Sequence, residues 1–469
     1  MMELLLTLDR SRRTPISIQI AHGVRDAIFS QRLPPGARLP PTRELAQRLR
    51  VSRTTVIEAY DWLVSEGYAQ ARQGSGTYLT SALSLSPDVA PQAQIPPRRT
   101  DIPVAAPVEF DFRPGLPALD LFPRARWKSA LARSLDCADA NALGYGPVEG
   151  LPRLRQLIAE YIARTRGLPV SAERVVITIG VAQALDLLLR VLAPIQKIAI
   201  EEPSAEPVRR LIKIHGIPIL PVPVDDQGMQ VDLLESASPA PSAVHVVPSH
   251  QYPTGVVMSL ERRLSLLGWA ADHDAVILED DYDSEFRFDQ SPPVALAALD
   301  AKQRVVYIGT FSKTLFPALR MGFCVLPERL MDGLLSLKWF SDRCVPVLEQ
   351  LALIEWLESG IFERHVKRMR RIYSLRRETL ANTIAAQFGR RASIHGVPAG
   401  MHIMVSIDTT DSEEEILKRA LDSGIRVYPA SACYSERTPE RPAFVLGYGM
   451  MDEDAISLGV RRLAAAISK

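Results

Sequence analysis

A proline-rich stretch between residues 80 and 108 constrains the fold of this chain more than any other feature. It reads TSALSLSPDVAPQAQIPPRRTDIPVAAPV. Its prolines exclude a helix interior or a central strand, and it lacks the apolar periodicity of a buried segment. We therefore predict an interdomain linker at residues 81–107, between an amino-terminal domain at residues 1–80 and a larger domain at residues 108–469. A chain of 469 residues also exceeds what one hydrophobic core usually organises.

Three short helices are expected in the amino-terminal domain. Apolar residues recur at four-residue steps over residues 16–28, which is typical of an amphipathic helix, and LPPG then ends it. A second helix is expected to start with Thr42 as its cap, and Ser52 is placed to cap a third after a short turn. This arrangement predicts a helix-turn-helix, and YAQARQGSGTYL beyond Gly67 predicts two short strands around a tip, a wing.

The charge of this domain favours an anionic partner. In residues 1–80, eleven arginines outnumber seven acidic residues. Arg43 opens the second helix, and Arg53, Thr54 and Thr55 open the third. Such side chains can hold phosphate oxygens and reach base edges when a helix N-terminus enters a major groove. Periodicity alone leaves open a helical interaction module whose arginines are merely solvated.

A sequence motif favours DNA binding over a helical interaction module for this domain. The string PPGARLPPTRELAQRLRVSRTTVIEAYDWLVSEGYAQARQGSGTYL closely resembles the winged helix-turn-helix of GntR-type bacterial transcription regulators. The resemblance implies binding to double-stranded operator DNA. Carried over position by position, it implies DNA contacts from Arg43, Ser52, Arg53, Thr54, Thr55, Gln73 and Gly74.

The larger domain alternates apolar strands with helical stretches. Runs such as RVVIT, KIAI, AVIL and RVVYIG alternate with segments such as AQALDLLLRVLA. This alternation predicts an α/β domain with a mostly parallel sheet covered by helices. The expected fold class is therefore an α+β winged helix-turn-helix followed by an α/β domain.

A lysine follows one of these strands in YIGTFSKTLFPALRMGF. Lys313 can be a solvated charge, but its neighbours suggest a phosphorylated aldehyde cofactor. The lysine amine can condense with an aldehyde. Arg320 offers a planar fork suited to phosphate, and the Ser312 hydroxyl offers a second donor.

Two further strands end in residues that suit such a cofactor. The run AVILEDDYDSEF delivers Asp280 and Tyr282 at a carboxyl end, where ligands bind in open α/β sheets. Asp280 would face a pyridine nitrogen, and Tyr282 the ring oxygen. In TIGVAQALDLL, the amides of Val181 and Ala182 could bind phosphate at a helix N-terminus. Glu279, Asp281 and Asp283 can instead be a polar loop.

These pieces together resemble the fold-type I aminotransferases, with DFRPGLP, GYGPVEGLPRLR and PSHQYPTG in the same order. With the GntR-like head, the chain resembles the MocR-type regulators, the group that includes GabR. The resemblance implies pyridoxal 5'-phosphate as cofactor and a homodimer. It implies Lys313 as the Schiff-base lysine, Asp280 and Tyr282 at the ring, Arg320 at the phosphate, and Tyr145 as a phosphate donor across the dimer interface.

The chain departs from the family pattern at several positions. EEPSAEP places Ala205 where these proteins usually carry a tyrosine stacked on the cofactor ring, a contact worth about 0.5–1.5 kcal/mol beyond burial. Ala182 replaces a usual glutamine, and Arg441 is the candidate for an otherwise unmatched substrate-carboxylate arginine. These departures favour sensing of pyridoxal phosphate or an amino compound over efficient turnover.

Two alternatives remain, an active aminotransferase with a DNA-binding head and a DNA-binding protein whose large domain only dimerises. His245 and His250 invite a metal or triad interpretation, but no metal is expected. His245 lies on an expected strand, where a packed or hydrogen-bonded histidine is the commoner case, and His250 falls in the family-like PSHQYPTG beside the expected cofactor. The Arg-rich ERHVKRMRRIYSLRR is adequately explained as a solvated helix face, with a DNA contact left open.

The remaining features indicate a cytoplasmic protein. The opening MMELLL is too short for a signal peptide or a membrane span. The four cysteines are scattered without a C-x-x-C pair, which favours free thiols over disulfides or zinc.

Overall fold

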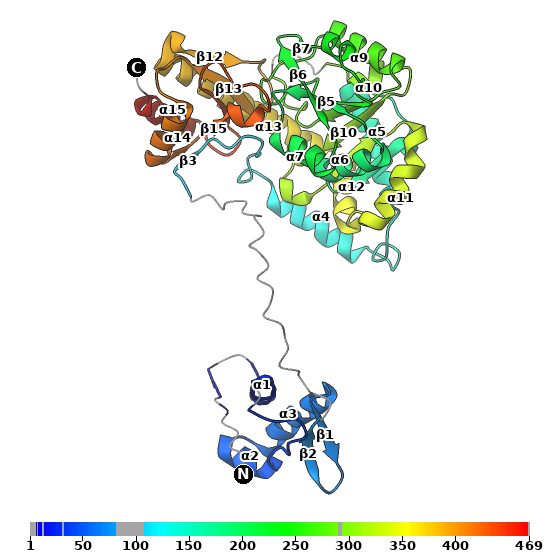
Figure 1. The fold of residues 1–469 in the computed structure, drawn as a ribbon, viewed down its shortest axis with the longest axis vertical. Coiled ribbons are helices and arrows are strands. Elements are labelled where there is room, and N and C mark those ends of the chain that lie inside the picture. Colours follow the sequence, from blue (N-terminus) through cyan, green and yellow to red (C-terminus); the bar gives the residue numbers. More distant parts are fainter. Residues whose placement is uncertain are drawn as a thin grey trace. The chain divides into compact units, whose positions relative to one another are not determined.

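The computed structural model describes residues 6, 8–11, 14–30, 32–80, 107–288 and 293–467 (Figure 1). The chain divides into two compact units, Met1–Ala105 and Ala106–Lys469. The predicted linker at residues 81–107 lies outside the described residues except at its last position. The exact domain boundaries therefore remain predictions.

The amino-terminal unit contains a helix-turn-helix followed by a hairpin. Its elements are α1 (Ile16–Phe29), α2 (Thr42–Leu49), α3 (Arg53–Ser65), β1 (Ala69–Arg72) and β2 (Gly76–Leu79). Ser52 caps α3 as expected, since its Oγ accepts the Thr55 N–H at 3.1 Å. Thr42 is the first residue of α2 and not its cap, because Pro41 occupies the cap position and offers no side-chain acceptor.

The three helices and the hairpin share one apolar core. Ile20 and Val24 of α1 pack with Leu45 of α2 and with Val56 and Leu63 of α3, and all five are fully buried. Each such side chain contributes about 1.5–3 kcal/mol when removed from water. The apolar periodicity of the sequence therefore fixes the face of each helix, and the opposite faces are left to solvent.

An eight-stranded sheet organises the larger unit. Its strands are β4 (Val175–Thr178), β5 (Ile198–Glu202), β6 (Ile219–Asp225), β7 (Gly228–Met229), β8 (Ala243–Val246), β9 (Val276–Asp281), β10 (Val305–Thr310) and β11 (Gly322–Val325). They are arranged in the order β4-β11-β10-β9-β8-β5-β6-β7. The neighbours from β10 to β6 are parallel, whereas β11 runs antiparallel to both β10 and β4. The predicted mostly parallel sheet is confirmed.

Helices cover both faces of this sheet, which is why its strands read as continuous apolar runs. Between residues 124 and 358, the helices of the larger unit are α4 (Arg124–Asp136), α5 (Pro152–Arg166), α6 (Val181–Val191), α7 (Glu206–Ile214), α8 (Asp232–Glu235), α9 (Leu260–Asp272), α10 (Leu296–Leu299), α11 (Met331–Ser341) and α12 (Val347–Glu358). Apolar residues of α6, α7 and α11 pack in one cluster with β4, β5, β9 and β10. Residues of α9 and α10 pack on the other side of the sheet.

A second, smaller sheet completes the larger unit. It is antiparallel and contains β12 (Ala392–His395), β13 (His402–Ile407), β16 (Ala443–Gly447) and β15 (Tyr428–Pro429) in that order. The short strands β3 (Phe110–Asp111) and β14 (Ile425–Arg426) pair in parallel. The long α13 (Ile361–Phe388) lies against α15 (Glu453–Ala466) and α12, and α14 (Glu413–Asp422) lies beside α15 (Figure 1). No helix among the described residues is long and apolar enough to cross a membrane.

Candidate functional site

Lys313 lies in the turn that follows β10, at the carboxyl edge of the main sheet. Its Nζ donates a hydrogen bond to the carbonyl oxygen of Gly115 at 2.7 Å. A Cβ on Gly115, whose φ is +76°, would lie 3.2 Å from that nitrogen, so glycine permits the close approach. Burial lowers the pKa of Lys313, and the nearby charges of Asp283 and Asp280 oppose this shift.

Asp280 lies at the same edge, near the end of β9. The parallel pairing of β9 and β10 places Asp280 opposite Ile308. Its Oδ2 is 3.6 Å from Nε2 of His245 on β8. Its buried Oδ1 has no hydrogen-bond partner among the described residues, and neither ring nitrogen of His245 has one. A buried carboxylate oxygen without a donor is costly, so this position suits a protonated ring nitrogen of a ligand.

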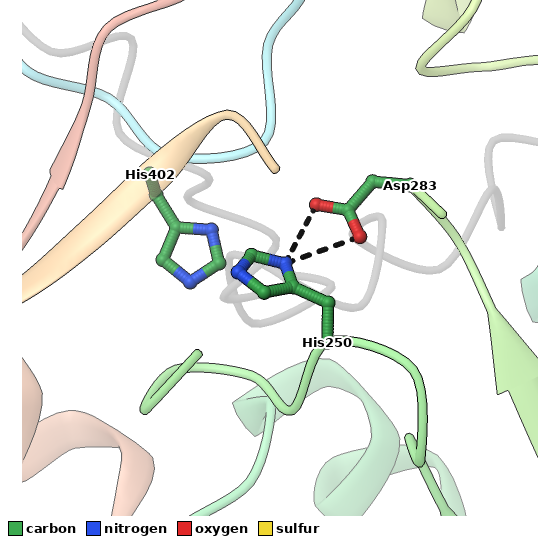
Figure 2. Close-up of side chains that lie close together, drawn as sticks. All are labelled: His250, Asp283 and His402. Carbon is green, nitrogen blue, oxygen red and sulfur yellow. Dashed lines mark hydrogen bonds and ion pairs between the residues drawn. The ribbon is translucent and has the colours of Figure 1, made fainter. Parts of the chain in front are cut away.

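Tyr282, the other predicted ring-contacting residue, is half-buried beside a cluster of buried polar groups formed by His250, Asp283 and His402 (Figure 2). Its hydroxyl oxygen is 3.2 Å from Nδ1 of His250. The same Nδ1 lies 3.0 and 3.2 Å from the two oxygens of Asp283. His402 on β13 packs beside His250 with ring centroids 5.1 Å apart, and its Nε2 donates to the Pro253 carbonyl at 3.2 Å.

The predicted phosphate residues gather at the N-terminus of α6. Gly180 is the N-cap of α6, with φ +80° and no side-chain acceptor, so the N–H groups of Val181 and Ala182 begin the helix. Arg320 donates from Nη2 to the Ile179 carbonyl at 2.8 Å, and a Cβ on Gly180 would lie 3.1 Å from the same nitrogen. A guanidinium over a helix N-terminus makes a strongly electropositive position.

The other two predicted cofactor residues are Ser312 and Tyr145. Ser312 is buried, and its Oγ lies 3.1 Å from Oγ1 of Thr310. Tyr145 is 80% exposed, with the guanidinium of Arg343 5.7 Å from its ring centroid. The predicted phosphate role of Tyr145 requires a second subunit.

Two of the departures from the family pattern, at Ala205 and Arg441, also have defined positions. Ala205 is the N-cap of α7 and presents no aromatic ring. Arg441 is 60% exposed along its side chain and pairs at 3.7 Å with Asp408, itself 61% exposed. An arginine engaged at the surface in this way gives no support to the predicted carboxylate clamp.

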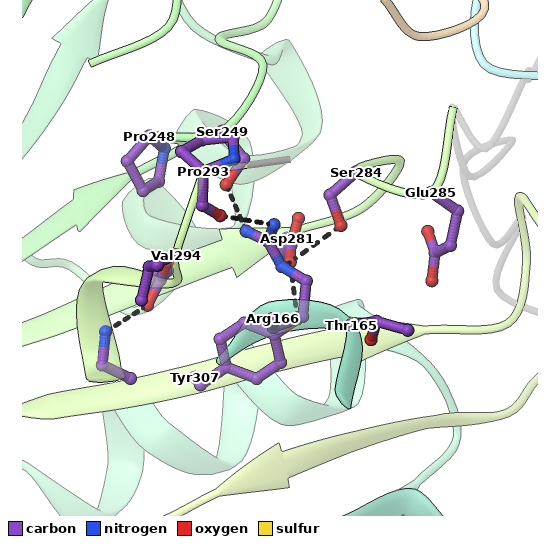
Figure 3. A network of polar contacts seen from close by, with 12 residues as sticks. Thr165, Arg166, Pro248, Ser249, Asp281, Ser284, Glu285, Pro293, Val294 and Tyr307 are labelled. Atoms are coloured by element: carbon purple, nitrogen blue, oxygen red, sulfur yellow. Dashed lines mark hydrogen bonds and ion pairs between the residues drawn. The ribbon is translucent and has the colours of Figure 1, made fainter. Parts of the chain in front are cut away.

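A buried ion pair supports the loop that carries Tyr282 and Asp283 (Figure 3). Nε of Arg166, at the end of α5, is 2.7 Å from Oδ2 of Asp281, which also accepts the Tyr307 hydroxyl at 2.5 Å. The same guanidinium donates to Ser249 at 2.6 Å. Asp281 is therefore no solvated loop residue, because it joins the end of β9 to Arg166 of α5, which in turn contacts the segment preceding His250.

Sequence reasoning missed another buried carboxylate, Glu201 on β5. Its Oε2 accepts the Val247 N–H at 3.1 Å and the Gln251 side-chain amide at 3.3 Å. Burial raises the pKa of Glu201 to about 8, and the charge of Asp280 adds to the rise. The pair EE in EEPSAEP gave no signal for this role, because it depends on the neighbouring strand β8.

The predicted DNA-contacting residues lie near one another on the amino-terminal unit. Arg43, Arg53 and Thr54 are exposed at the N-terminal turns of α2 and α3. Nε of Arg53 donates to Oγ1 of Thr42 at 3.3 Å, which links the two turns. Ser52 and Thr55 are engaged with each other in the α3 cap, their hydroxyl oxygens 2.8 Å apart.

The wing residues form the tip of the hairpin. Gln73 and Gly74 are exposed between β1 and β2, and the φ of +72° at Gly74 explains a glycine there. The hairpin carries Arg72, whose guanidinium lies 4.7 Å from the ring centroid of Tyr78. The tip thus presents a small backbone surface beside a cation.

Both units match known families. Residues 16–79 match the gntR family of bacterial regulatory proteins, and residues 118–444 match aminotransferase class I and II. The chain is 34% identical to the probable rhizopine catabolism regulatory protein MocR of Rhizobium meliloti, over 98% of this chain and 96% of that protein. It is 31% identical to the pyridoxine biosynthesis transcriptional regulator PdxR of Corynebacterium glutamicum, over 99% of each chain.

Solved structures resemble the larger unit. LysN, the α-aminoadipate aminotransferase of Thermus thermophilus, was solved with N-(5'-phosphopyridoxyl)-L-leucine. It superimposes with a TM-score of 0.70 at 30% identity, over 76% of this chain and 91% of that chain. A kynurenine aminotransferase of Pyrococcus horikoshii gives a TM-score of 0.70 at 29% identity, over 76% and 90%. The chain therefore belongs to the MocR-type HTH transcription regulators, in which a GntR helix-turn-helix domain is joined to an aminotransferase class I and II domain.

Proposed function

We propose that this protein is a DNA-binding transcription regulator whose larger unit binds pyridoxal 5'-phosphate through Lys313 and senses that cofactor or an amino compound. The observation that carries the proposal is a pair of groups at one sheet edge. The Lys313 amine is partly buried, and Oδ1 of Asp280 is buried without a donor among the described residues. This pair offers an amine for an aldehyde and an acceptor for a protonated ring nitrogen.

The remaining residues fit the same cofactor. When bound, pyridoxal phosphate supplies an aldehyde that condenses with a primary amine and a ring that withdraws electrons. Tyr282 offers a hydroxyl for the ring oxygen. Arg320 and the N–H groups of Val181 and Ala182 form the electropositive position that suits the phosphate. Ser312 is proposed as a further phosphate donor.

The amino-terminal unit is proposed to bind double-stranded operator DNA. Arg43, Arg53 and Thr54 are exposed where a helix N-terminus would enter a major groove. Gln73 and Gly74 are proposed to contact the backbone from the wing. Ser52 and Thr55 are proposed to act through the cap of α3, whose geometry they hold.

Sensing, rather than amino-group transfer, is the proposed use of the larger unit. Ala205 provides no ring to stack on the cofactor, and Arg441 pairs with Asp408 at the surface. The full-length relatives carry the names of transcription regulators, whereas the aminotransferases cover only the larger unit. A homodimer is part of the proposal, with Tyr145 completing the partner's phosphate site.

Absorbance spectroscopy of the full-length protein tests the proposal. Pyridoxal phosphate should give a visible band that survives gel filtration, and borohydride reduction should leave the cofactor mass on the peptide containing Lys313. Lys313→Ala should lose both signals. Lys302→Ala is the matched control, because Lys302 is exposed and lies outside the site. An unchanged band in Lys313→Ala would refute the assignment.

A further inference from the structure

His250 lies between two candidate partners that compete for one nitrogen. Its Nδ1 is 3.0 Å from Oδ2 of Asp283 (Figure 2), and it is 3.2 Å from the hydroxyl oxygen of Tyr282. The side chains of His250 and Asp283 are only 3% and 2% exposed. Water therefore has little access to their contact, so these groups determine whether Nδ1 carries a hydrogen.

The carboxylate decides where that hydrogen lies. An ionised carboxylate only accepts hydrogen bonds, so a bare Nδ1 facing Asp283 would leave two lone pairs in contact in a buried site. Nδ1 of His250 therefore carries its hydrogen and donates it to Asp283. A protonated Nδ1 cannot accept from Tyr282, so the hydroxyl hydrogen of Tyr282 is left for Asp283, its other hydrogen-bond partner, or for an acceptor on a bound ligand.

We propose that Asp283 and His250 are positioning residues of the cofactor site, because Asp283 fixes the hydrogen of His250 on Nδ1 and thereby reserves the Tyr282 hydroxyl as a donor to the cofactor ring oxygen. This inference rests on the proposed binding of pyridoxal phosphate. It explains why Tyr282 and Asp283 directly follow β9, since these two residues are adjacent in sequence and contact the same imidazole.

Other groups near Asp283 define its electrostatic surroundings. Burial raises the pKa of Asp283, whereas His250 and Lys313 lower it and Asp281 raises it further. Burial also raises the pKa of Tyr282 well above its usual value, with Asp283 adding to the rise, so this hydroxyl keeps its hydrogen at neutral pH. Burial raises the pKa of Tyr448, beyond β16, and the charge of Asp283 adds to the rise.

A metal ion is the competing explanation of this cluster. Ligand atoms of His250, Asp283 and His402 all lie within 4.8 Å of one another. However, Nδ1 of His250 is engaged by Asp283, and Nε2 of His402 donates to the Pro253 carbonyl. Metal coordination would have to use the other ring nitrogens or displace these bonds, so the hydrogen-bonded arrangement is favoured.

A double-mutant cycle on the cofactor-loaded, full-length protein tests the proposal. The readout is the pH midpoint of the visible absorbance change, which reports the proton at Nζ of Lys313. A Tyr282 donor to the ring oxygen competes with that proton, so Tyr282→Phe should raise the midpoint by about 1 unit. In an Asp283→Leu background, His250 can turn its lone pair to Tyr282, and Tyr282→Phe should shift the midpoint by less than half as much.

Asp283→Asn separates hydrogen bonding from charge. The amide oxygen of the new asparagine can still accept from Nδ1 of His250. In the Asp283→Asn background, Tyr282→Phe should therefore shift the pH midpoint as much as it does in the wild type. Equal shifts in the wild-type and Asp283→Leu backgrounds would overturn the inference. If Asp283→Leu fails to fold, ¹⁵N NMR of labelled histidines, assigned with His250→Phe, still decides. It should show Nδ1 of His250 protonated, and a bare Nδ1 would refute the proposal.

Zinc addition is the last arm of the experiment. The midpoint should not respond to zinc, and a zinc-dependent shift that is lost in His402→Gln would replace the proposal with a metal site. The inference and the proposed function fail separately. A protein that takes up no pyridoxal phosphate contradicts the function, whereas a loaded protein with additive shifts contradicts only the role of Asp283 and His250.

Discussion

At the scale of single residues, the proposed cofactor site depends strongly on one carboxylate oxygen. Oδ1 of Asp280 is buried without a partner among the described residues. Asp280→Asn removes the charge that would hold a protonated ring nitrogen, so affinity for pyridoxal phosphate should fall about 10- to 100-fold, as for a hydrogen bond to a charged group. Equilibrium titration of the visible band measures it. Asp332→Asn, an exposed change on α11, is the control, and equal affinity in all three proteins would contradict the role.

Glu201 gives a residue-scale prediction about pH. Burial raises its pKa from 4.5 to about 8, so between these values the folded state binds more protons than the unfolded state. Glu201 therefore stabilises the fold less as the pH rises through this window. Glu201→Gln cannot ionise and should show a flatter decline of unfolding free energy between pH 5 and pH 8. Urea unfolding at a series of pH values tests this, and parallel declines would show that Glu201 does not titrate there.

At the scale of elements, the ion pair of Arg166 and Asp281 joins α5 to β9. Both side chains are almost completely buried, at 3% and 1% exposure. Arg166→Met should leave an uncompensated buried carboxylate and destabilise the larger unit by about 3–5 kcal/mol. Urea unfolding should show the loss, while Arg153→Met, at a half-exposed pair with Glu358, should change little. Similar stability of the two variants would mean that this pair does not hold the loop.

The helix-turn-helix supports a second prediction at this scale. Arg53→Ala should lower operator affinity and reduce the salt dependence of binding by about one counterion per lost phosphate contact. Fluorescence anisotropy over a salt series measures both quantities. Arg25→Ala on α1, a partly exposed arginine beside Asp26, should leave them unchanged. A concurrent loss of the cofactor band would indicate misfolding instead of a lost contact.

The elements also show what a sequence can and cannot predict here. Apolar runs predicted β9 and β10, and the strand ends placed Lys313, Asp280 and Tyr282 at one edge of the sheet. Side-chain partners were not predictable in the same way. Arg166 and Asp281 are 115 residues apart in the sequence, and they meet only because α5 packs against the main sheet. His250 was assigned to the cofactor region, but its bonds to Asp283 and Tyr282 depend on how two loops fold together.

At the scale of the whole molecule, the remaining question is how the larger unit influences DNA binding. The predicted linker at residues 81–107 is proline-rich and could extend to about 80–90 Å at roughly 3.1 Å per residue. A chain of that reach would allow the head of one subunit to dock on the larger unit of its partner. Two heads on a dimer would bind paired half-sites.

A ligand can change operator affinity only if it favours one arrangement of the heads over another. If chemistry at Lys313 selects that arrangement, pyridoxal phosphate or a cognate amine should change the operator affinity of the intact protein by about 5- to 150-fold, the usual range of allosteric coupling. Lys313→Ala should bind operator DNA with one affinity at every ligand concentration, whereas Lys302→Ala should respond like the wild type. Anisotropy titrations with and without each ligand provide the measurement. Identical curves for the wild type across a broad amine panel would leave the larger unit as a dimerisation scaffold, because a site without differential affinity for the two arrangements cannot transmit a signal.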